Sequence, residues 1–171
     1  AVWNGGDEEN LSEQDCPYPE NYLTTYPQTK AIAERMVLQA NGAEFATTAL
    51  RPHLIWGPGD PHLVPRILEK AINNRLMMVG EGKNQVDMIY IDNAVSAHLK
   101  AALAPNSNVA GKAYFVSDDD PVVLWNWINT FLNRMGLSMV KRKISYSNAM
   151  KLGALLEGIY GFLRLKSEPP M

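Results

Sequence analysis

Tyr26 and Lys30 lie four residues apart in the stretch 24–34, TTYPQTKAIAE. On an α-helix this spacing places the two side chains on the same face. A phenol ordinarily holds its proton up to about pH 10, and a neighbouring ammonium favours the phenolate. A tyrosine tuned in this way can pass a proton to or from a carbonyl or alcohol oxygen near neutral pH. The pair therefore indicates acid–base chemistry at a hydroxyl or keto group.

A helix over 26–41 must carry this pair. Thr24 or Thr25 is a suitable N-cap, and Pro27 is tolerated because the first turn of a helix has donors without partners anyway. Gly42 is expected to close the helix, and a short buried strand is expected over 45–50. The residues expected to pack inward are Ala31, Ala33, Met36, Val37 and Ala40.

The remaining chain alternates helical patterns with short apolar strands, which predicts an α/β architecture. Pro and Gly fill 51–60, which reads as a loop. Asp92 and Asp120 are expected N-caps, Pro121 opens the second of these helices, and Gly136 ends it. Strands are expected at 77–79, 86–91 and 112–117, and helices at 63–74, 93–103, 121–135 and 147–165. Two apolar stripes stand out: Leu124, Trp127, Ile128, Phe131, Leu132 and Met135, then Leu152, Leu155, Leu156, Ile159, Phe162 and Leu163.

Composition excludes several classes of function. A net charge of −2 over 171 residues predicts no nucleic-acid partner. The single Cys16, which lies in a polar loop, excludes an internal disulfide and suits a reducing, cytoplasmic location. No run of twenty apolar residues predicts a spanning helix, and no Cys/His cluster has metal-ligand spacing. The chain opens on Ala1 without a methionine, so we expect an internal piece of a longer protein.

Five ordered segments resemble the extended short-chain dehydrogenase/reductases, specifically the 3β-hydroxysteroid dehydrogenase-like branch. These segments are YPQTKAIAE at 26–34, LRPHLIWGPGD at 50–60, HLVP at 62–65, VDMIYIDNA at 86–94 with AHL at 97–99, and GKAYFV at 111–116. Within the branch, DEE at 7–9, the 50–60 segment and EPPM at 168–171 are most similar to bacterial 2-alkyl-3-oxoalkanoate reductases. The resemblance implies the C-terminal portion of a Rossmann-like doubly wound parallel sheet with a smaller substrate-binding lobe.

The resemblance also implies roles for particular residues. Tyr26 would be the catalytic acid/base, and Lys30 would lower its pKa and hydrogen-bond the nicotinamide ribose of NAD or NADP. The backbone that passes along the nicotinamide ring would be that of Pro52, His53, Leu54 and Ile55. A substrate-holding Ser or Thr and the Gly-rich pyrophosphate turn would both lie upstream of Ala1. The chain alone is therefore expected to be inactive.

The implied domain division is a cofactor domain over 1–104, with substrate-lobe segments interleaved at about 52–91, and a last strand with lobe helices over 105–171. The implied reaction interconverts a hydroxyl and a keto group on an apolar substrate. We favour a long-chain 2-alkyl-3-oxoacid reductase over a 3β-hydroxysteroid or sterol dehydrogenase. A nucleotide-sugar epimerase or dehydratase fits the apolar helix at 147–165 less well, and a catalytically dead binding module fits the intact Tyr26/Lys30 pair less well.

The helix over 147–165 has two interpretations. It is either a packing helix of the substrate lobe or an apolar lid over an apolar substrate. As a lid it would also make peripheral membrane contact through Lys151, Arg164 and Lys166. A homodimer is compatible with the resemblance. Arg51 is expected to anchor loop carbonyls or a carboxylate, and His53 and His62 are expected to pack within loops rather than to catalyse.

Overall fold

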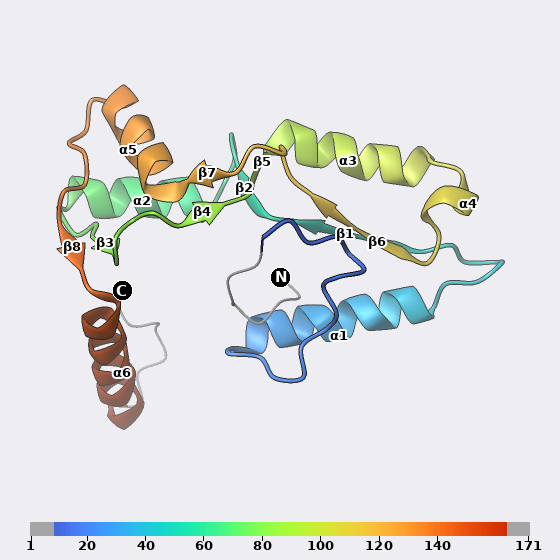
Figure 1. Cartoon of the computed structure of the whole chain (residues 1–171), viewed down its shortest axis with the longest axis horizontal. Helices are drawn as coiled ribbons and strands as arrows, with labels where there is room; N and C mark the ends of the chain where they lie inside the picture. Colours follow the sequence, from blue (N-terminus) through green and yellow to red (C-terminus); the bar gives the residue numbers. More distant parts are fainter. Residues whose placement is uncertain (1–8, 164–171) are drawn as a thin grey trace. The chain divides into compact units, whose positions relative to one another are not determined.

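The computed structural model describes residues 9–163, which form two compact units (Figure 1). Within these residues, the first unit consists of 9–60 and 87–121 and the second of 61–86 and 122–163. The domain division at 104/105 that the resemblance implies stays a prediction. The structure places the strand at 112–116 in the first unit because that strand pairs with 48–52.

The first unit contains two parallel strand pairs. Its elements are α1 (Thr25–Gln39), β1 (Thr48–Pro52), β2 (Leu54–Trp56), β5 (Met88–Tyr90), α3 (Ile91–Leu103), α4 (Asn106–Val109) and β6 (Lys112–Val116). β1 pairs with β6 and β2 pairs with β5, in registers that align Arg51 with Phe115 and Ile55 with Ile89. Parallel neighbours need a crossover, and α3 lies in the part of the chain that connects β1 to its partner β6. Ile89, Ala94 and Ala31 are almost fully buried in this unit.

The second unit is built around the contact between two helices. Its elements are α2 (Leu63–Ile72), β3 (Met78–Val79), β4 (Gln85–Val86), β7 (Val122–Val123), α5 (Leu124–Arg134), β8 (Lys143–Ile144) and α6 (Tyr146–Phe162). Ile67 of α2 packs with Ile128 and Leu132 of α5 to form the buried cluster. β3 pairs in parallel with β8, and β4 pairs in antiparallel with β7.

The α/β class is confirmed, while several local expectations are wrong. β1 covers 48–52 rather than 45–50, and Phe45 is 63% exposed. The stretch 51–60 is not all loop, since it holds the end of β1 and all of β2. The predicted strand over 86–91 is two strands, β4 and β5, separated at Asp87.

Two predicted caps are also wrong. α3 begins at Ile91, so Asp92 lies inside its first turn and Tyr90 is the N-cap. α5 begins at Leu124, because Val122 and Val123 pair with β4 before the helix starts, and Asp120 and Pro121 therefore precede a strand. The apolar stripe of α5 is otherwise confirmed, except for Met135, which is 57% exposed. Gly136 does end the helix, with a φ of 72°.

The inward face of α1 differs from the predicted one. Ala33, Met36, Val37 and Ala40 are exposed, whereas Pro27, Ala31, Glu34 and Leu38 are the positions that are buried or half-buried. The helix ends at Gln39, and Gly42 instead forms a turn in which its N–H donates to the Phe45 carbonyl at 2.9 Å. Glu34 faces inward on α1 because its carboxylate has a buried partner, Arg51, on β1.

Candidate functional site

Tyr26 and Lys30 lie in the first two turns of α1. The lysine Nζ is 5.7 Å from the centroid of the Tyr26 ring, and the ring is 64% exposed. The two side chains therefore share one accessible helix face, as the spacing predicted. Thr24 has an extended backbone at the N-cap, but its side chain makes no capping hydrogen bond within the described residues. The Thr29 hydroxyl instead donates to the Tyr26 carbonyl at 2.9 Å.

The first turn of α1 lies at the end of the first unit where β1 and β6 finish (Figure 1). α1 runs antiparallel to β1 because only a short connection, 40–47, joins them. In open α/β sheets, ligands bind outside the carboxyl ends of the parallel strands. Tyr26 and the strand ends are thus placed at the edge where a ligand is expected.

The four residues predicted to line the nicotinamide join β1 to β2. Pro52 ends β1, His53 interrupts the ladder, and Leu54 begins β2. The His53 N–H donates to the Val116 carbonyl at 3.2 Å, and its Nδ1 lies 2.6 Å from the Asp87 carbonyl oxygen. His53 therefore has the loop-packing contacts that the sequence led us to expect. Ile55 is 38% exposed, so this short segment is accessible from solvent at Ile55.

The turn after β2 requires glycine. Gly57 has a φ of 138°, and a Cβ built there would lie 2.6 Å from Cγ2 of Ile91. Trp56 and Tyr90, which are aligned across β2 and β5, make an edge-to-face contact with centroids 5.1 Å apart. This close approach brings the carboxyl ends of β2 and β5 against the start of α3.

Asp118 makes hydrogen bonds at the start of α3, a role that the sequence did not predict. Its Oδ2 accepts from the Tyr90 N–H at 2.9 Å and its Oδ1 from Asn93 Nδ2 at 2.8 Å. The Asp118 N–H donates to the Met88 carbonyl at 2.9 Å. The carboxylate thus binds the residue that precedes α3 and the side chain of Asn93 in its first turn. In the sequence, Asp118 is one of three consecutive aspartates, Asp118 to Asp120, and no local pattern distinguishes it from the other two.

Three side chains from separate segments meet between α1 and β1. Arg51 donates from Nη2 to Glu34 Oε1 at 2.7 Å and from Nε to Oε2 at 3.0 Å. The Tyr18 hydroxyl donates to Glu34 Oε1 at 2.5 Å. The side chains of Arg51 and Glu34 are only 7% and 8% exposed. The expected carboxylate partner of Arg51 is confirmed, and Glu34 and Tyr18 are the members that sequence reasoning missed.

The ionisation of Glu34 reflects a competition. Burial disfavours the carboxylate, but the hydrogen bonds from Arg51 and Tyr18 outweigh it, so the pKa of Glu34 lies below its ordinary value. Burial and the bond to this carboxylate raise the pKa of the Tyr18 phenol. The hydrogen bond to Glu34 likewise raises the pKa of Arg51. All three groups therefore keep the protonation states that maintain the contact.

Acid should weaken this contact. Because the folded pKa of Glu34 is depressed, its contribution to stability is present above the ordinary value of 4.5 and is lost as the pH falls through the folded pKa. We expect the melting temperature of the wild type to fall more steeply below pH 4.5 than that of Glu34→Gln. Calorimetry across this range checks the expectation, with Glu44→Gln as an exposed-carboxyl control. Parallel curves for wild type and Glu34→Gln would contradict it.

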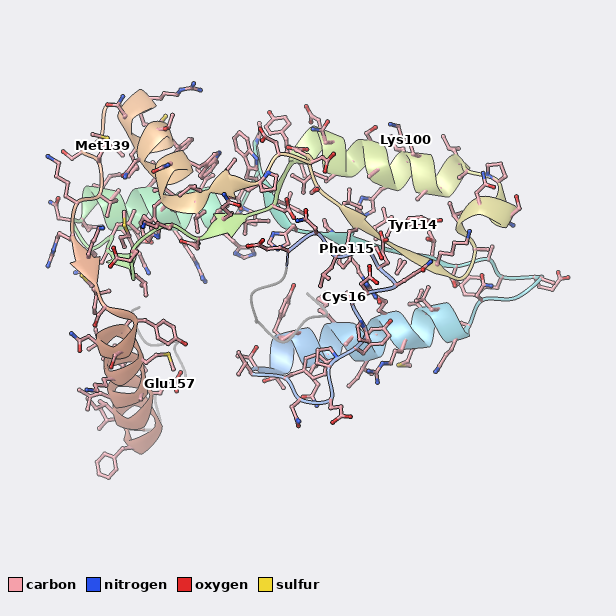
Figure 2. The ribbon with its side chains drawn as sticks, viewed as in Figure 1. Cys16, Lys100, Tyr114, Phe115, Met139 and Glu157 are labelled. Atoms are coloured by element: carbon pink, nitrogen blue, oxygen red, sulfur yellow. The ribbon has the colours of Figure 1, made fainter. Side chains whose placement is uncertain are left out.

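In the second unit, α6 carries the apolar stripe predicted for 147–165, with 164 and 165 outside the described residues. Leu156 is half-buried, whereas Leu155 is 60% exposed and Phe162 is 87% exposed. A shallow hollow of about 380 Å³ on this helix is lined by Ala154, Leu155, Gly158, Ile159, Phe162 and Leu163. Glu157 is the one acidic residue in the sequence of α6 and is labelled in Figure 2. α6 therefore presents an exposed apolar surface.

None of the helices within residues 9–163 is long and apolar enough to cross a membrane. The same residues contain no group of three His, Cys, Asp or Glu side chains that could hold a metal ion. Cys16, expected in a polar loop, is buried at 6% exposure, and Figure 2 labels it near α1.

Known sequences identify the family to which these features belong. The model of the 3-beta hydroxysteroid dehydrogenase/isomerase family matches residues 2–146. A 2-alkyl-3-oxoalkanoate reductase of Stenotrophomonas maltophilia is 48% identical over 165 residues, covering 95% of this chain and 50% of the relative. The human sterol-4-alpha-carboxylate 3-dehydrogenase, decarboxylating, is 39% identical over 151 residues, covering 85% of this chain and 40% of the relative. The chain thus spans about half the length of these relatives.

Solved structures agree on the fold. MoeE5 in complex with UDP-glucose and NAD is 25% identical, with a TM-score of 0.65 over 85% of this chain and 49% of that one. A UDP-glucuronic acid 4-epimerase from Bacillus cereus, in complex with UDP-glucuronic acid and NAD, is 21% identical. Its TM-score is 0.67 over 85% of this chain and 46% of that one. The parallel strand pairs are accordingly part of a Rossmann-like α/β fold.

Proposed function

Because this chain belongs to the 3-beta hydroxysteroid dehydrogenase/isomerase family, we propose that the full-length protein is an NAD(P)-dependent oxidoreductase. It interconverts a hydroxyl and a keto group on an apolar substrate. The observation that carries the proposal is the Tyr26–Lys30 pair, accessible on α1 at the carboxyl ends of β1 and β6. An exposed phenol beside a lysine suits proton transfer to an oxygen that arrives from solvent.

The residues present fit the nicotinamide half of NAD or NADP. The segment Pro52, His53, Leu54 and Ile55 interrupts a strand ladder next to the strand ends and leaves Ile55 partly exposed. When bound, the nicotinamide supplies or accepts the hydride. Lys30 would hold the ribose, and Tyr26 would give a proton to the substrate oxygen or take one from it. The protein's share of the chemistry is to hold these groups against one carbon.

A long-chain 2-alkyl-3-oxoacid is the substrate class that we propose. Two relatives carry the name 2-alkyl-3-oxoalkanoate reductase, at 48% and 42% identity. The exposed stripe on α6 supports an apolar ligand of some length, as a lid over an alkyl chain would. A sterol is the second candidate substrate, which the 39% identity to the human sterol dehydrogenase supports. A charged nucleotide sugar would be a poor partner for this stripe.

The test of the function is direct. Full-length protein is mixed with reduced cofactor and a 2-alkyl-3-oxoacid or a 3-ketosterol, and cofactor oxidation is followed by absorbance. UDP-glucose, which has no keto group to reduce, is incubated with the protein and oxidised cofactor, and its conversion is followed by chromatography of the sugar product. We expect turnover with the oxoacid and little with the nucleotide sugar. Turnover confined to the sterol would select the sterol as substrate, and no turnover with either apolar compound would overturn the proposal.

A peripheral membrane contact through 147–165 is a further part of the proposal. Lys151 is exposed on the helix that carries the apolar stripe, while Arg164 and Lys166 lie outside the described residues. Basic residues next to exposed apolar ones suit an anionic lipid surface. We expect cosedimentation with phosphatidylglycerol vesicles but not with phosphatidylcholine vesicles. Removal of each positive charge should weaken binding by roughly a factor of five. Binding of a Lys151→Gln variant as tight as that of the wild type would contradict a membrane contact. A homodimer stays a prediction, which sedimentation velocity would check.

A further inference from the structure

The buried cluster of Tyr18, Glu34 and Arg51 is poorly explained as a source of stability alone. Removing two charges from water is costly, and a buried ion pair often repays no more than that cost. Nη1 of Arg51 is buried and has no hydrogen-bond partner among residues 9–163, so part of the cost is not offset there. A buried ion pair is better suited to selecting one arrangement of the segments that it joins.

The segments joined are those that carry the proposed chemistry. Glu34 lies one helical turn after Lys30 on α1, and Arg51 directly precedes Pro52 on β1. The guanidinium contacts both carboxylate oxygens, at 3.0 Å from Nε and 2.7 Å from Nη2. A two-point contact of this kind fixes orientation as well as distance, which a single hydrogen bond does not. It therefore sets how far along β1 the helix lies and how it is rotated.

The same cluster holds the loop that leads into α1. Tyr18, in that loop, donates to Glu34, and its ring lies 4.3 Å from the guanidinium carbon of Arg35. The guanidinium carbon of Arg51 lies 5.2 Å from the ring centroid of Phe115, the β6 residue aligned with Arg51. Phe115 is labelled on β6 in Figure 2. Its backbone N–H donates to Oε1 of Glu13, in the loop, at 2.6 Å. The loop, α1, β1 and β6 are thus tied together around one carboxylate.

We propose that Tyr18, Glu34 and Arg51 form a positioning latch that sets the Tyr26 hydroxyl against the segment 52–55. This inference rests on the proposed oxidoreductase function. The latch residues are positioning residues rather than catalytic ones, since Arg51 and Glu34 are buried while Tyr26 is exposed. A misplacement of about 1 Å at a reacting group can lower the rate about 10²-fold, which gives the latch its importance.

The test compares latch variants with a control that loosens the same region. Tyr18→Phe, Glu34→Gln and Arg51→Lys change the latch in the full-length protein. Arg51→Lys keeps the charge but loses the planar fork that makes the two-point contact. Thr47→Val is the matched control, because the buried Thr47 hydroxyl donates to the Val37 carbonyl at 2.8 Å and also ties the chain to α1. Melting temperature, kcat and KM are measured for each.

We expect kcat to fall about 10-fold for Tyr18→Phe and up to about 10²-fold for Glu34→Gln and Arg51→Lys, with KM nearly unchanged. Thr47→Val should keep the wild-type kcat even where its melting temperature falls as far. The proposal is overturned if kcat follows melting temperature across all four variants. It is also overturned if Arg51→Lys keeps wild-type kcat, because charge without the fork would then suffice.

A readout without turnover separates this inference from the proposed function. The protein is labelled with 3-fluorotyrosine, and its Tyr26 resonance is assigned by the line lost in Tyr26→Phe. We expect one Tyr26 line in the wild type and in Thr47→Val, and a broadened or split line in Glu34→Gln and Arg51→Lys. An unchanged line in those two variants overturns the latch. Wild-type protein that lacks turnover but follows this pattern overturns the proposed function and retains the latch.

Discussion

Replacing Tyr26 with phenylalanine is expected to lower kcat of the full-length protein by about 10²- to 10⁴-fold. The phenol is the group proposed to exchange a proton with the substrate oxygen, and phenylalanine cannot do so. Because the ring is 64% exposed, losing its hydroxyl leaves no unpaired buried group and no cavity. Cofactor affinity and melting temperature should therefore stay close to wild type. The loss should appear in kcat rather than KM, as an interaction made in the transition state requires.

Stopped-flow kinetics measure kcat and KM of the Tyr26→Phe variant, and cofactor titration measures its affinity for the cofactor. Tyr114→Phe is the matched control, since it also removes one tyrosine hydroxyl from the first unit, there a donor to the Asn108 carbonyl at 2.7 Å. We expect it to reduce stability slightly and to leave kcat unchanged. A Tyr26→Phe enzyme with wild-type kcat would remove Tyr26 from the catalytic role and leave Lys30 without its proposed partner.

The second large effect concerns substrate length. Each buried CH₂ group of a ligand contributes about 0.8 kcal/mol, which is roughly a factor of four in affinity. A chain that covers the stripe on α6 should therefore gain several orders of magnitude in kcat/KM between short and long 3-oxoacids. A fused-ring substrate should show the same trend with ring number. Assaying a chain-length series beside UDP-glucose measures the slope.

Variants on α6 test where the slope originates. Leu155→Asp and Phe162→Asp place a charge on the exposed stripe, at 60% and 87% exposed positions, so the fold should tolerate both. We expect each to flatten the chain-length dependence and to leave turnover of short substrates little changed. Glu157→Gln, which removes a charge from the same helix, should keep the wild-type slope. A flat dependence in the wild type, or turnover of the sugar alone, would favour an epimerase or dehydratase.

Local spacing in the sequence was enough to predict the helix that carries Tyr26 and Lys30. A four-residue separation places two side chains on one helix face whatever surrounds the helix. The apolar period of α5 similarly predicted Ile128 and Leu132 as core residues. The α/β class and the strand at 112–116 also followed from alternating local patterns.

The structure alone revealed β2, because a three-residue strand followed by Gly57 and Pro58 has no periodicity to detect. Its pairing with β5 is a contact between segments that lie more than thirty residues apart in the sequence. The start of α5 was missed for the same reason, since Val122 and Val123 become a strand only when β4 lies beside them. Such pairings depend on long-range contacts that a local pattern does not encode.

Spacing along the chain predicts which residues of α1 could do chemistry, whereas long-range contacts fix how that helix is held. Hydrophobicity favoured Met36 and Val37 as inward residues, yet both are exposed and Glu34 is buried. A carboxylate is a poor core residue unless a partner offsets its desolvation. Arg51 and Tyr18 provide that partner from two other segments of the chain. Only the folded chain brings the three together, so only the structure could reveal the latch.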